Sequence, residues 1–132
     1  MPYVGQVDDY IADAGRGRKG ATFEAVGYGV QRTNPALTWK GMEEADYDLR
    51  KADLMLVDNK GLLGIGHIVP DQFMMLSGDA AHGGTCFGDS GGPNFIGDSN
   101  VIGAVTSFGL NGNCAGISGN YRLDQADDLS WF

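Results

Sequence analysis

The sequence predicts an all-β domain, and three observations favour that class. Short apolar runs alternate along the chain with polar or glycine-rich segments, as strands alternate with turns. The 22 glycines are about twice the usual share and are scattered rather than periodic, which suits many tight turns. With 132 residues, 42% of them hydrophobic and 20% charged, the chain has the size and composition of one domain with a single core.

Six runs rich in apolar and β-branched residues are predicted to be strands. In chain order they are Thr22–Gln31, Leu49–Asp58, Gln72–Ser77, Asn94–Ile96, Val101–Phe108 and Asn120–Leu123. The turn sequence GDSN at 97–100 separates the fourth and fifth runs and indicates a hairpin. Residues 33–48 are predicted to be a surface loop because Pro35 and Gly41 interrupt them, and 59–70 gives no clear element.

The two ends of the chain contain the only predicted helical segments. Gln125–Phe132 is predicted to be a terminal helix with Asp124 as its N-cap. Its apolar residues, which we expect to be buried, are Leu129, Trp131 and Phe132. Residues 1–20 are polar, end in GRGRKG and have the composition of a linker, with one weak helical turn around Val7–Ala14. The domain itself is therefore predicted to span 21–132.

The net charge of −8 and the isoelectric point near 4.4 limit the partners of the chain. An acidic surface disfavours binding to nucleic acid or to an anionic membrane. No run approaches the roughly 18 apolar residues of a membrane span. The first residues have neither the basic start nor the apolar stretch of a signal peptide. The two cysteines form no Cys-x-x-Cys pair and there is no histidine cluster, so no metal site is predicted.

The hexapeptide GDSGGP at 88–93 contains the candidate catalytic residues of the chain. Gly88 and Gly91 allow a tight turn and the close approach of a substrate carbonyl. The N–H groups of Gly88 and Ser90 can then converge on the oxyanion that develops when the Ser90 hydroxyl attacks. The Asp89 carboxylate is enclosed by its neighbours and is expected to need a cation. The pattern predicts a nucleophilic serine beside an anion-binding loop.

This hexapeptide resembles the nucleophile loop of the trypsin/chymotrypsin-like serine proteases, the S1 peptidase family. The resemblance extends over residues 21–132 and is most specific at 84–93. It implies a six-stranded antiparallel Greek-key barrel with a short C-terminal helix, equivalent to the second barrel of these proteases. Residues 1–20 would then be a remnant of the inter-barrel linker. The resemblance also implies a secreted serine endopeptidase that acts on polypeptides and uses no metal or organic cofactor.

A serine hydroxyl needs a neighbouring base, and that base needs a third group to orient it. In the resembled family the histidine and aspartate of this triad lie on an N-terminal barrel, and no matching base motif precedes Ser90 here. We expect His82 to be an exposed loop residue and His67 a loop or core residue. The resemblance therefore implies the C-terminal half of an enzyme without its triad histidine and aspartate. The isolated chain is expected to be inactive.

The resemblance assigns the remaining site residues by position. It implies a disulfide between Cys86 and Cys114, with two buried thiols as the alternative. The substrate pocket would be formed by Gly84, Ser107, Phe108, Gly109 and Gly119. With Gly84 at its floor the pocket would be neutral and roomy, and would suit aromatic or large aliphatic side chains. Asp89 would pair with the ammonium group that activation cleavage liberates, although Met1 heads the wrong segment for that role.

Two other functions remain open. The chain could be a non-catalytic half-barrel that binds peptides or a partner, or one chain of a split protease that another chain completes. A coding region upstream of Met1 that contains Ala-Ala-His-Cys would favour the truncated protease. A stop codon and a ribosome-binding site there would favour the binding module.

Overall fold

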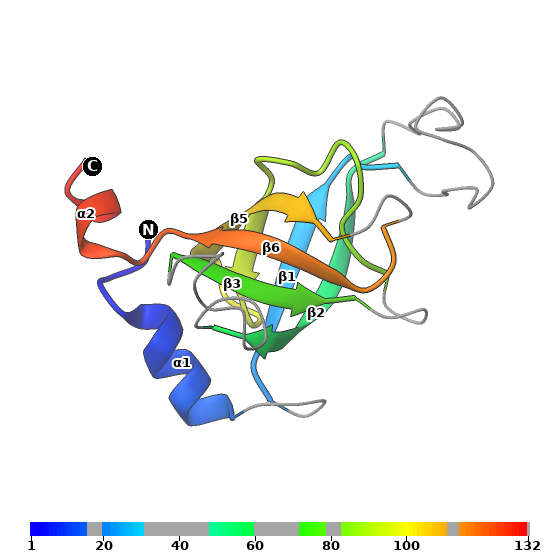
Figure 1. Cartoon of the computed structure of the whole chain (residues 1–132). Coiled ribbons are helices and arrows are strands. Elements are labelled where there is room, and N and C mark those ends of the chain that lie inside the picture. Colours follow the sequence, from blue (N-terminus) through cyan, green and yellow to red (C-terminus); the bar gives the residue numbers. More distant parts are fainter. Residues whose placement is uncertain (16–19, 31–47, 60–71, 79–82, 111–113, 132) are drawn as a thin grey trace.

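Six strands close into one antiparallel barrel in the part of the chain that the structure describes (Figure 1). The structure is a computed structural model that describes residues 1–15, 20–30, 48–59, 72–78, 83–110 and 114–131. The strands are β1 (Thr22–Gly27), β2 (Arg50–Asp58), β3 (Phe73–Ser77), β4 (Pro93–Ile96), β5 (Ile102–Gly109) and β6 (Ile117–Arg122). The helices are α1 (Gln6–Ala14) and α2 (Ala126–Leu129).

The order of the strands around the barrel is β1-β2-β3-β6-β5-β4, and β4 pairs back onto β1. β3 pairs with β6 rather than with β4, the next strand in the chain, so that neighbours in space are not neighbours in sequence. This is the behaviour of Greek-key connections. β4 and β5 form the predicted hairpin. The predicted fold class, an all-β six-stranded antiparallel barrel with a short C-terminal helix, is confirmed.

The first strand is shorter than predicted. β1 ends at Gly27, and the chain then leaves the sheet and runs beside the loop that carries Ser90. There the Val30 N–H donates to the Phe87 carbonyl at 2.9 Å. The predicted end at Gln31 lies outside the described residues, as do nearly all of the segments 33–48 and 59–70.

The last strand is longer at its start than predicted. β6 begins at Ile117 rather than at Asn120, because Ser118 and Gly119 pair with both β3 and β5. Serine and glycine are weak strand formers, so their own propensity gives no signal for this extension. Two neighbouring strands impose the strand conformation on them.

The core fills the barrel and continues beneath α1. Buried residues alternate along β1, so that Phe23 and Ala25 point inward. β2 contributes Leu54 and Leu56, and β3 contributes a run of three buried residues that includes Met74. Removing these side chains from water is the main favourable contribution to folding of the barrel.

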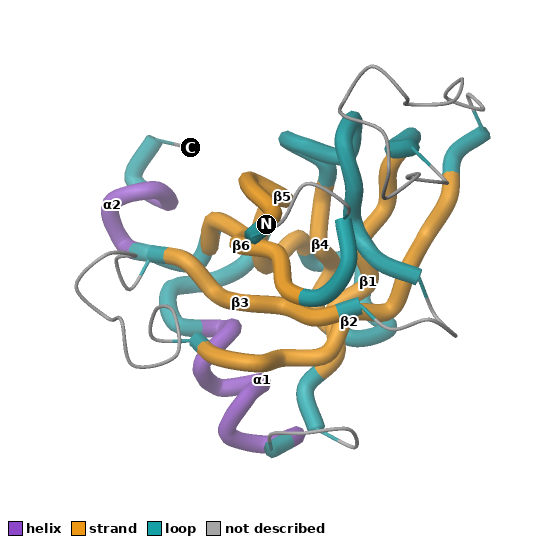
Figure 2. Tube along the Cα trace, turned by 45° about the vertical axis from the view of Figure 1, so that its right-hand side comes forward, coloured by secondary structure: helices purple, strands orange, loops and turns teal. Residues whose placement is uncertain are grey.

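α1 is longer than the single weak turn that the sequence predicts. It spans nine residues and buries Val7 and Ile11, which lie four residues apart and therefore face the same side. Tyr10 packs edge-on against Phe23, with ring centroids 5.7 Å apart. Figure 2 shows α1 as a purple helix at the lower side of the barrel. The helix contributes to the core, and the assignment of residues 1–20 to an inter-barrel linker stays a prediction.

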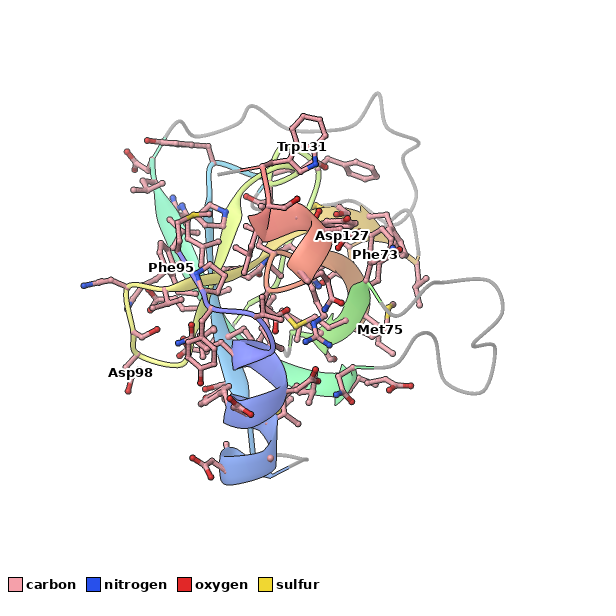
Figure 3. All side chains as sticks on the ribbon, turned by 90° about the vertical axis from the view of Figure 1, so that its left-hand side faces the viewer. Phe73, Met75, Phe95, Asp98, Asp127 and Trp131 are labelled. Carbon is pink, nitrogen blue, oxygen red and sulfur yellow. A yellow bond between two sulfur atoms is a disulfide. The ribbon has the colours of Figure 1, made fainter. Side chains whose placement is uncertain are left out.

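α2 differs from the predicted helix in length, in its cap and in its burial. It has four residues, and its N-cap is Gln125, whose side chain makes no capping hydrogen bond. Asp124 is not the cap, because its carboxylate accepts a hydrogen bond from the Val7 N–H at 2.9 Å instead. Trp131 is 88% exposed and extends beyond α2 (Figure 3), so its predicted burial is wrong. Phe132 lies outside the described residues.

An ion-pair network around the buried Arg122 guanidinium joins both ends of the chain to β6. Arg122 donates to Asp124 at 2.8 and 2.9 Å and to Asp8 of α1 at 2.9 and 3.2 Å. Burial alone would lower the pKa of Arg122, but the hydrogen bonds to Asp124 and Asp8 outweigh burial and raise that pKa above its ordinary value. The Gly5 N–H also donates to the Asp124 carbonyl at 3.0 Å. The two chain ends consequently lie on the same side of the barrel (Figure 1).

Candidate active site

A tight turn precedes Ser90. The Asp89 N–H donates to the Cys86 carbonyl at 3.1 Å, and Gly88 holds the third position of this turn with a φ of 100°. A positive φ at the third position alone defines a type II turn, which favours glycine because any side chain there would be strained. The first glycine of the motif is therefore required by the turn.

A second turn carries Ser90 itself. The Gly92 N–H donates to the Asp89 carbonyl at 2.9 Å, and Gly91 holds the third position with a φ of 84°. Two further hydrogen bonds attach this turn to β5. The Gly91 N–H donates to the Thr106 carbonyl at 2.8 Å, and the Thr106 N–H donates to the Gly92 carbonyl at 2.9 Å. The serine is thus presented from a turn that is anchored to the barrel.

The two turns leave a pair of main-chain donors unused beside the serine. Neither the Gly88 N–H nor the Ser90 N–H donates a hydrogen bond to any described group. Ser90 is exposed, and its hydroxyl has no hydrogen-bond partner among the described residues. Preorganised N–H donors next to a nucleophile can stabilise an oxyanion.

The carboxylate of Asp89 is bound by main-chain amides from two segments. Its Oδ1 accepts from the Gly29 N–H at 2.8 Å, and its Oδ2 accepts from the Cys86 N–H at 2.8 Å. Hydrogen bonds from N–H groups to an ionised carboxylate are stronger than neutral ones. Asp89 therefore joins the extension of β1 to the turn that precedes Ser90.

Two glycines make room for this carboxylate. A Cβ atom added at Gly27 or at Gly29 would collide with the Asp89 side chain. The structure shows what fills the space, which is the carboxylate that sets the loop.

The cation that the sequence analysis expects for Asp89 is not found among the described residues, where two amides bind the carboxylate. Beside Asp89 lies a hollow of about 440 Å³ that Arg50 and Lys51 also border. No described residue forms an ion pair with Asp89 across it. Pairing of Asp89 with a liberated amino group stays a prediction.

The predicted disulfide between Cys86 and Cys114 is present, with Cα atoms 5.1 Å apart. It joins the turn before Ser90 to the segment that leads into β6. Because the Cys86 N–H also binds Asp89, the disulfide and the carboxylate fix the same residue from two sides.

A cavity of about 480 Å³ opens beside Ser90. The disulfide and the loop form one wall, β5 from Thr106 onward forms the second, and residues 114–118 form the third. No described residue that lines it is charged, and the walls include the rings of Phe87 and Phe108. Ser107, Phe108 and Gly109, three of the residues predicted to form the pocket, line this cavity.

Two predicted pocket residues lie elsewhere. Gly84 borders the hollow beside Asp89 rather than the cavity at Ser90. Gly119 is covered by the Phe108 ring, with which an added Cβ would collide. Phe108 in turn packs on Phe73, with ring centroids 5.5 Å apart. Both glycines keep their pocket roles only as predictions.

Several residues that line the cavity were not predicted as pocket residues, among them Thr106 and Ser118. Thr106 directly precedes the predicted strand residue Ser107, and Ser118 directly precedes Gly119. Consecutive residues of a regular strand point to opposite faces, so a position beside a predicted wall residue gives no signal of its own. The pairing of β5 with β6 shifts its register between Thr106 and Phe108, and this irregularity interrupts the alternation at the cavity wall.

The histidines His67 and His82 both lie outside the described residues, so their predicted roles are not tested. Within the described ranges no group of three or more histidine, cysteine, aspartate or glutamate side chains could hold a metal ion. Neither described helix has the length and apolar composition needed to cross a membrane.

A closed barrel of this topology with a GDSGGP loop defines a chymotrypsin-like barrel of the serine protease class. Residues 6–123 of the chain match the family model Trypsin. The match covers most of the chain, which therefore belongs to the trypsin family of serine proteases. These proteins are hydrolases of polypeptides and are commonly extracellular. Among curated proteins, none matches the chain.

Proposed function

We propose that this chain supplies the nucleophile, the oxyanion hole and the substrate pocket of a serine endopeptidase that works through an acyl-enzyme. One observation carries the proposal: the exposed Ser90 hydroxyl stands beside two unused N–H donors, on Gly88 and on Ser90 itself. The loop is held by Asp89 and by β5, so these donors need no rearrangement before the reaction. Donors fixed before the reaction are the usual source of oxyanion stabilisation.

The reaction has two halves. Ser90 Oγ attacks the carbonyl carbon of the scissile peptide while a base takes the hydroxyl proton. The carbonyl oxygen becomes an oxyanion that accepts hydrogen bonds from the Gly88 and Ser90 amides. The C–N bond then breaks, the protonated base gives its proton to the leaving amine, and the acyl group stays on Ser90 oxygen. In the second half, water attacks the acyl carbonyl carbon while the base takes its proton. The bond to Ser90 Oγ then breaks, the base returns the proton to Oγ, and the carboxylic acid leaves.

The base is proposed to be a histidine, oriented by an aspartate, that a first barrel contributes from outside this chain. Two features support this. The Ser90 hydroxyl has no partner among the described residues, so the position of a base is open. The large side chains of Tyr28 and Phe87, which are 52% and 42% exposed, lie on the two segments that meet at Asp89 and offer an apolar surface to a partner.

The cavity beside Ser90 is proposed to bind the side chain that precedes the scissile bond. Its described lining has no charge, so a charged substrate side chain would be buried there without an ion partner. The rings and aliphatic groups of Phe108, Ile117 and Leu110 suit aromatic or large aliphatic side chains. The disulfide also supports a protein that works in an oxidising compartment, which fits the proposed secretion.

Labelling with a fluorophosphonate tests the proposal, because this reagent reacts with activated serine hydroxyls. We expect slow labelling of the chain alone and rapid labelling when a first barrel with a histidine–aspartate pair is present. Ser90→Ala should abolish both, since no other serine occupies the loop. Intact-mass measurement gives the stoichiometry, and a digest locates the adduct.

The same assay distinguishes the alternatives. Rapid labelling of the chain alone that disappears in His67→Ala or His82→Ala would show that a histidine of this chain is the base. Restoration of labelling by a separate chain that carries the first barrel would establish a split enzyme. If Ser90 is labelled neither with a first barrel in the same chain nor with one supplied as a separate chain, the protease proposal is contradicted. The peptide-binding half-barrel would then be the remaining alternative.

A further inference from the structure

A line of polar side chains runs through the barrel interior and ends at the cavity beside Ser90. Asn94 of β4 and Asn120 of β6 are fully buried, and Thr106 and Ser118 are 6% and 7% exposed. The last two also line the cavity. Buried polar groups are unfavourable unless they are bonded, so the direction of each hydrogen bond can be worked out in turn.

The orientation of Asn120 is fixed by a carbonyl group. A main-chain carbonyl only accepts, and the Ser118 carbonyl lies 3.1 Å from Asn120 Nδ2. The amide nitrogen of Asn120 must therefore face Ser118, and its Oδ1 must face the other way. Asn94 Nδ2 lies 3.2 Å from that Oδ1 and donates to it.

The orientation of Asn94 then determines the role of Thr106. With its nitrogen toward Asn120, Asn94 Nδ2 also donates to Thr106 Oγ1 at 3.1 Å. The Thr106 oxygen is thus an acceptor, and no described group accepts the proton of its hydroxyl. The Thr106 O–H remains a free donor at the wall of the cavity.

The other hydroxyls on the same two strands differ in this respect. The Ser118 hydroxyl donates to the Leu76 carbonyl at 3.4 Å, and the Ser107 hydroxyl donates to the Val105 carbonyl at 3.2 Å. Both protons are used within the barrel. Of the three cavity hydroxyls on β5 and β6, Thr106 alone keeps its proton available in the described structure.

One buried oxygen atom in this line of amides accepts no hydrogen bond from the described groups. Asn94 Oδ1 is buried and has no partner among the described groups. The Asn94 amide thus pairs the buried Asn120 Oδ1 through its nitrogen and leaves its own oxygen unpaired, which is unfavourable in a buried site. Its amide nitrogen, by contrast, sets the direction of the Thr106 hydroxyl.

We propose that Thr106 is a specificity-determining residue and that the cavity prefers tyrosine to phenylalanine before the scissile bond. The aromatic ring would pack on the apolar walls, and the phenolic oxygen would accept the Thr106 proton. Asn94 acts through Thr106 and is a positioning residue. A bonded site discriminates against the ligand that leaves its donor unpaired. This inference rests on the proposed function of the cavity as the substrate pocket.

Two matched ligands, N-acetyl-tyrosine methylamide and N-acetyl-phenylalanine methylamide, test the proposal with the chain as it stands. NMR titration of the labelled chain gives both dissociation constants and shows which amides respond. The tyrosine ligand should bind about fivefold to tenfold more tightly, as expected for one neutral hydrogen bond. Thr106→Val should remove this preference, and Thr106→Ser should keep it.

Two further variants serve as a matched control and as a substitute for Thr106→Val. Thr85→Val makes the same chemical change at another wall of the same cavity, outside the line of amides, and should leave the preference unchanged. Thr106→Ala should lose the preference like Thr106→Val, and so replaces it if valine prevents folding. The dispersion of the barrel amide signals checks the fold of each variant.

Each outcome has a distinct meaning. Equal binding of both ligands at the cavity, or a preference that survives in Thr106→Val and in Thr106→Ala, would overturn the role of Thr106 and leave the proposed function intact. Loss of the preference in Thr85→Val would show that Thr85 donates the hydrogen bond to tyrosine. That result would also overturn the role of Thr106. If neither ligand perturbs Ser90 or the cavity amides, the substrate pocket itself is wrong and the inference fails with it.

Discussion

Asp89 accepts a hydrogen bond from the Gly29 N–H at 2.8 Å across 60 residues of sequence. This contact and the matching one from the Cys86 N–H hold the turn before Ser90 in one conformation. The loop that carries Ser90 is thereby held by main-chain groups of the β1 extension and of the loop itself.

Gly29→Ala should disturb the loop, because the new Cβ would collide with the Asp89 carboxylate. Insertion of a methyl group into a packed site costs about 1–3 kcal/mol of unfolding free energy. Urea unfolding followed by fluorescence measures the loss. Gly84→Ala is the matched control, because its nearest neighbour would lie at 3.6 Å and its φ is not positive, so its stability should stay near that of the wild type. Equal stability of all three proteins would argue against the packing of Asp89 on Gly29.

Removal of the disulfide in Cys86→Ala/Cys114→Ala should lower the unfolding free energy by about 3–4 kcal/mol, since the loop it closes is of intermediate length. The Cys86 N–H would also lose its fixed position beside Asp89. Thermal unfolding of the variant, compared with the wild type with and without reductant, checks both statements. Reduced wild type should match the double variant, and a variant as stable as the oxidised wild type would contradict the prediction.

Arg122→Leu should be strongly destabilising, because it leaves the fully buried Asp124 carboxylate without its ion partner. Breaking a buried pair in this way costs about 3–5 kcal/mol. Lys51→Leu removes a cation from an exposed pair with Glu24 and should change stability little. Chemical denaturation of the two variants measures the difference, and similar losses in both would refute a special role for the Arg122 network.

Tyr121 should make the stability of the barrel depend on pH in the alkaline range. Burial, followed by the hydrogen bond to Asp128 at 3.0 Å, raises the pKa of Tyr121. A group whose pKa is higher in the folded state contributes fully below its unfolded pKa, and that contribution is lost as the pH rises through the folded pKa. Wild type should therefore lose more stability than Tyr121→Phe above the ordinary tyrosine pKa. Parallel declines in unfolding experiments across that range would contradict this.

The sequence was sufficient for features that local chemistry dictates. Apolar runs located all six strands, and the spacing of Gly88 and Gly91 reflects two turns that each need a positive φ at the third position. The extent of α1 was missed because only Val7 and Ile11 of a polar segment are buried. Asp124 has the right chemistry for a cap, but the tertiary contact with Arg122 takes its carboxylate. These contacts form only after the chain ends meet.

The line of amides that ends at Thr106 could not be predicted either. Asn94 and Asn120 lie 26 residues apart and are on strands that do not pair with each other. Only closure of the barrel around its interior brings them together. A single buried asparagine in a sequence does not reveal its partner, and the direction of the Thr106 hydroxyl depends on all of them.

Residue-resolved amide hydrogen exchange, measured by NMR, tests the central claim that Asp89 holds the Ser90 loop with the Gly88 and Ser90 N–H groups unbonded. We expect slow exchange at Gly29 and Cys86, whose N–H groups bind Asp89, and fast exchange at Gly88 and Ser90. In Asp89→Ala the first two should lose protection while the strand amides keep theirs. Protected Gly88 and Ser90 amides, or unprotected Gly29 and Cys86 amides in the wild type, would contradict it.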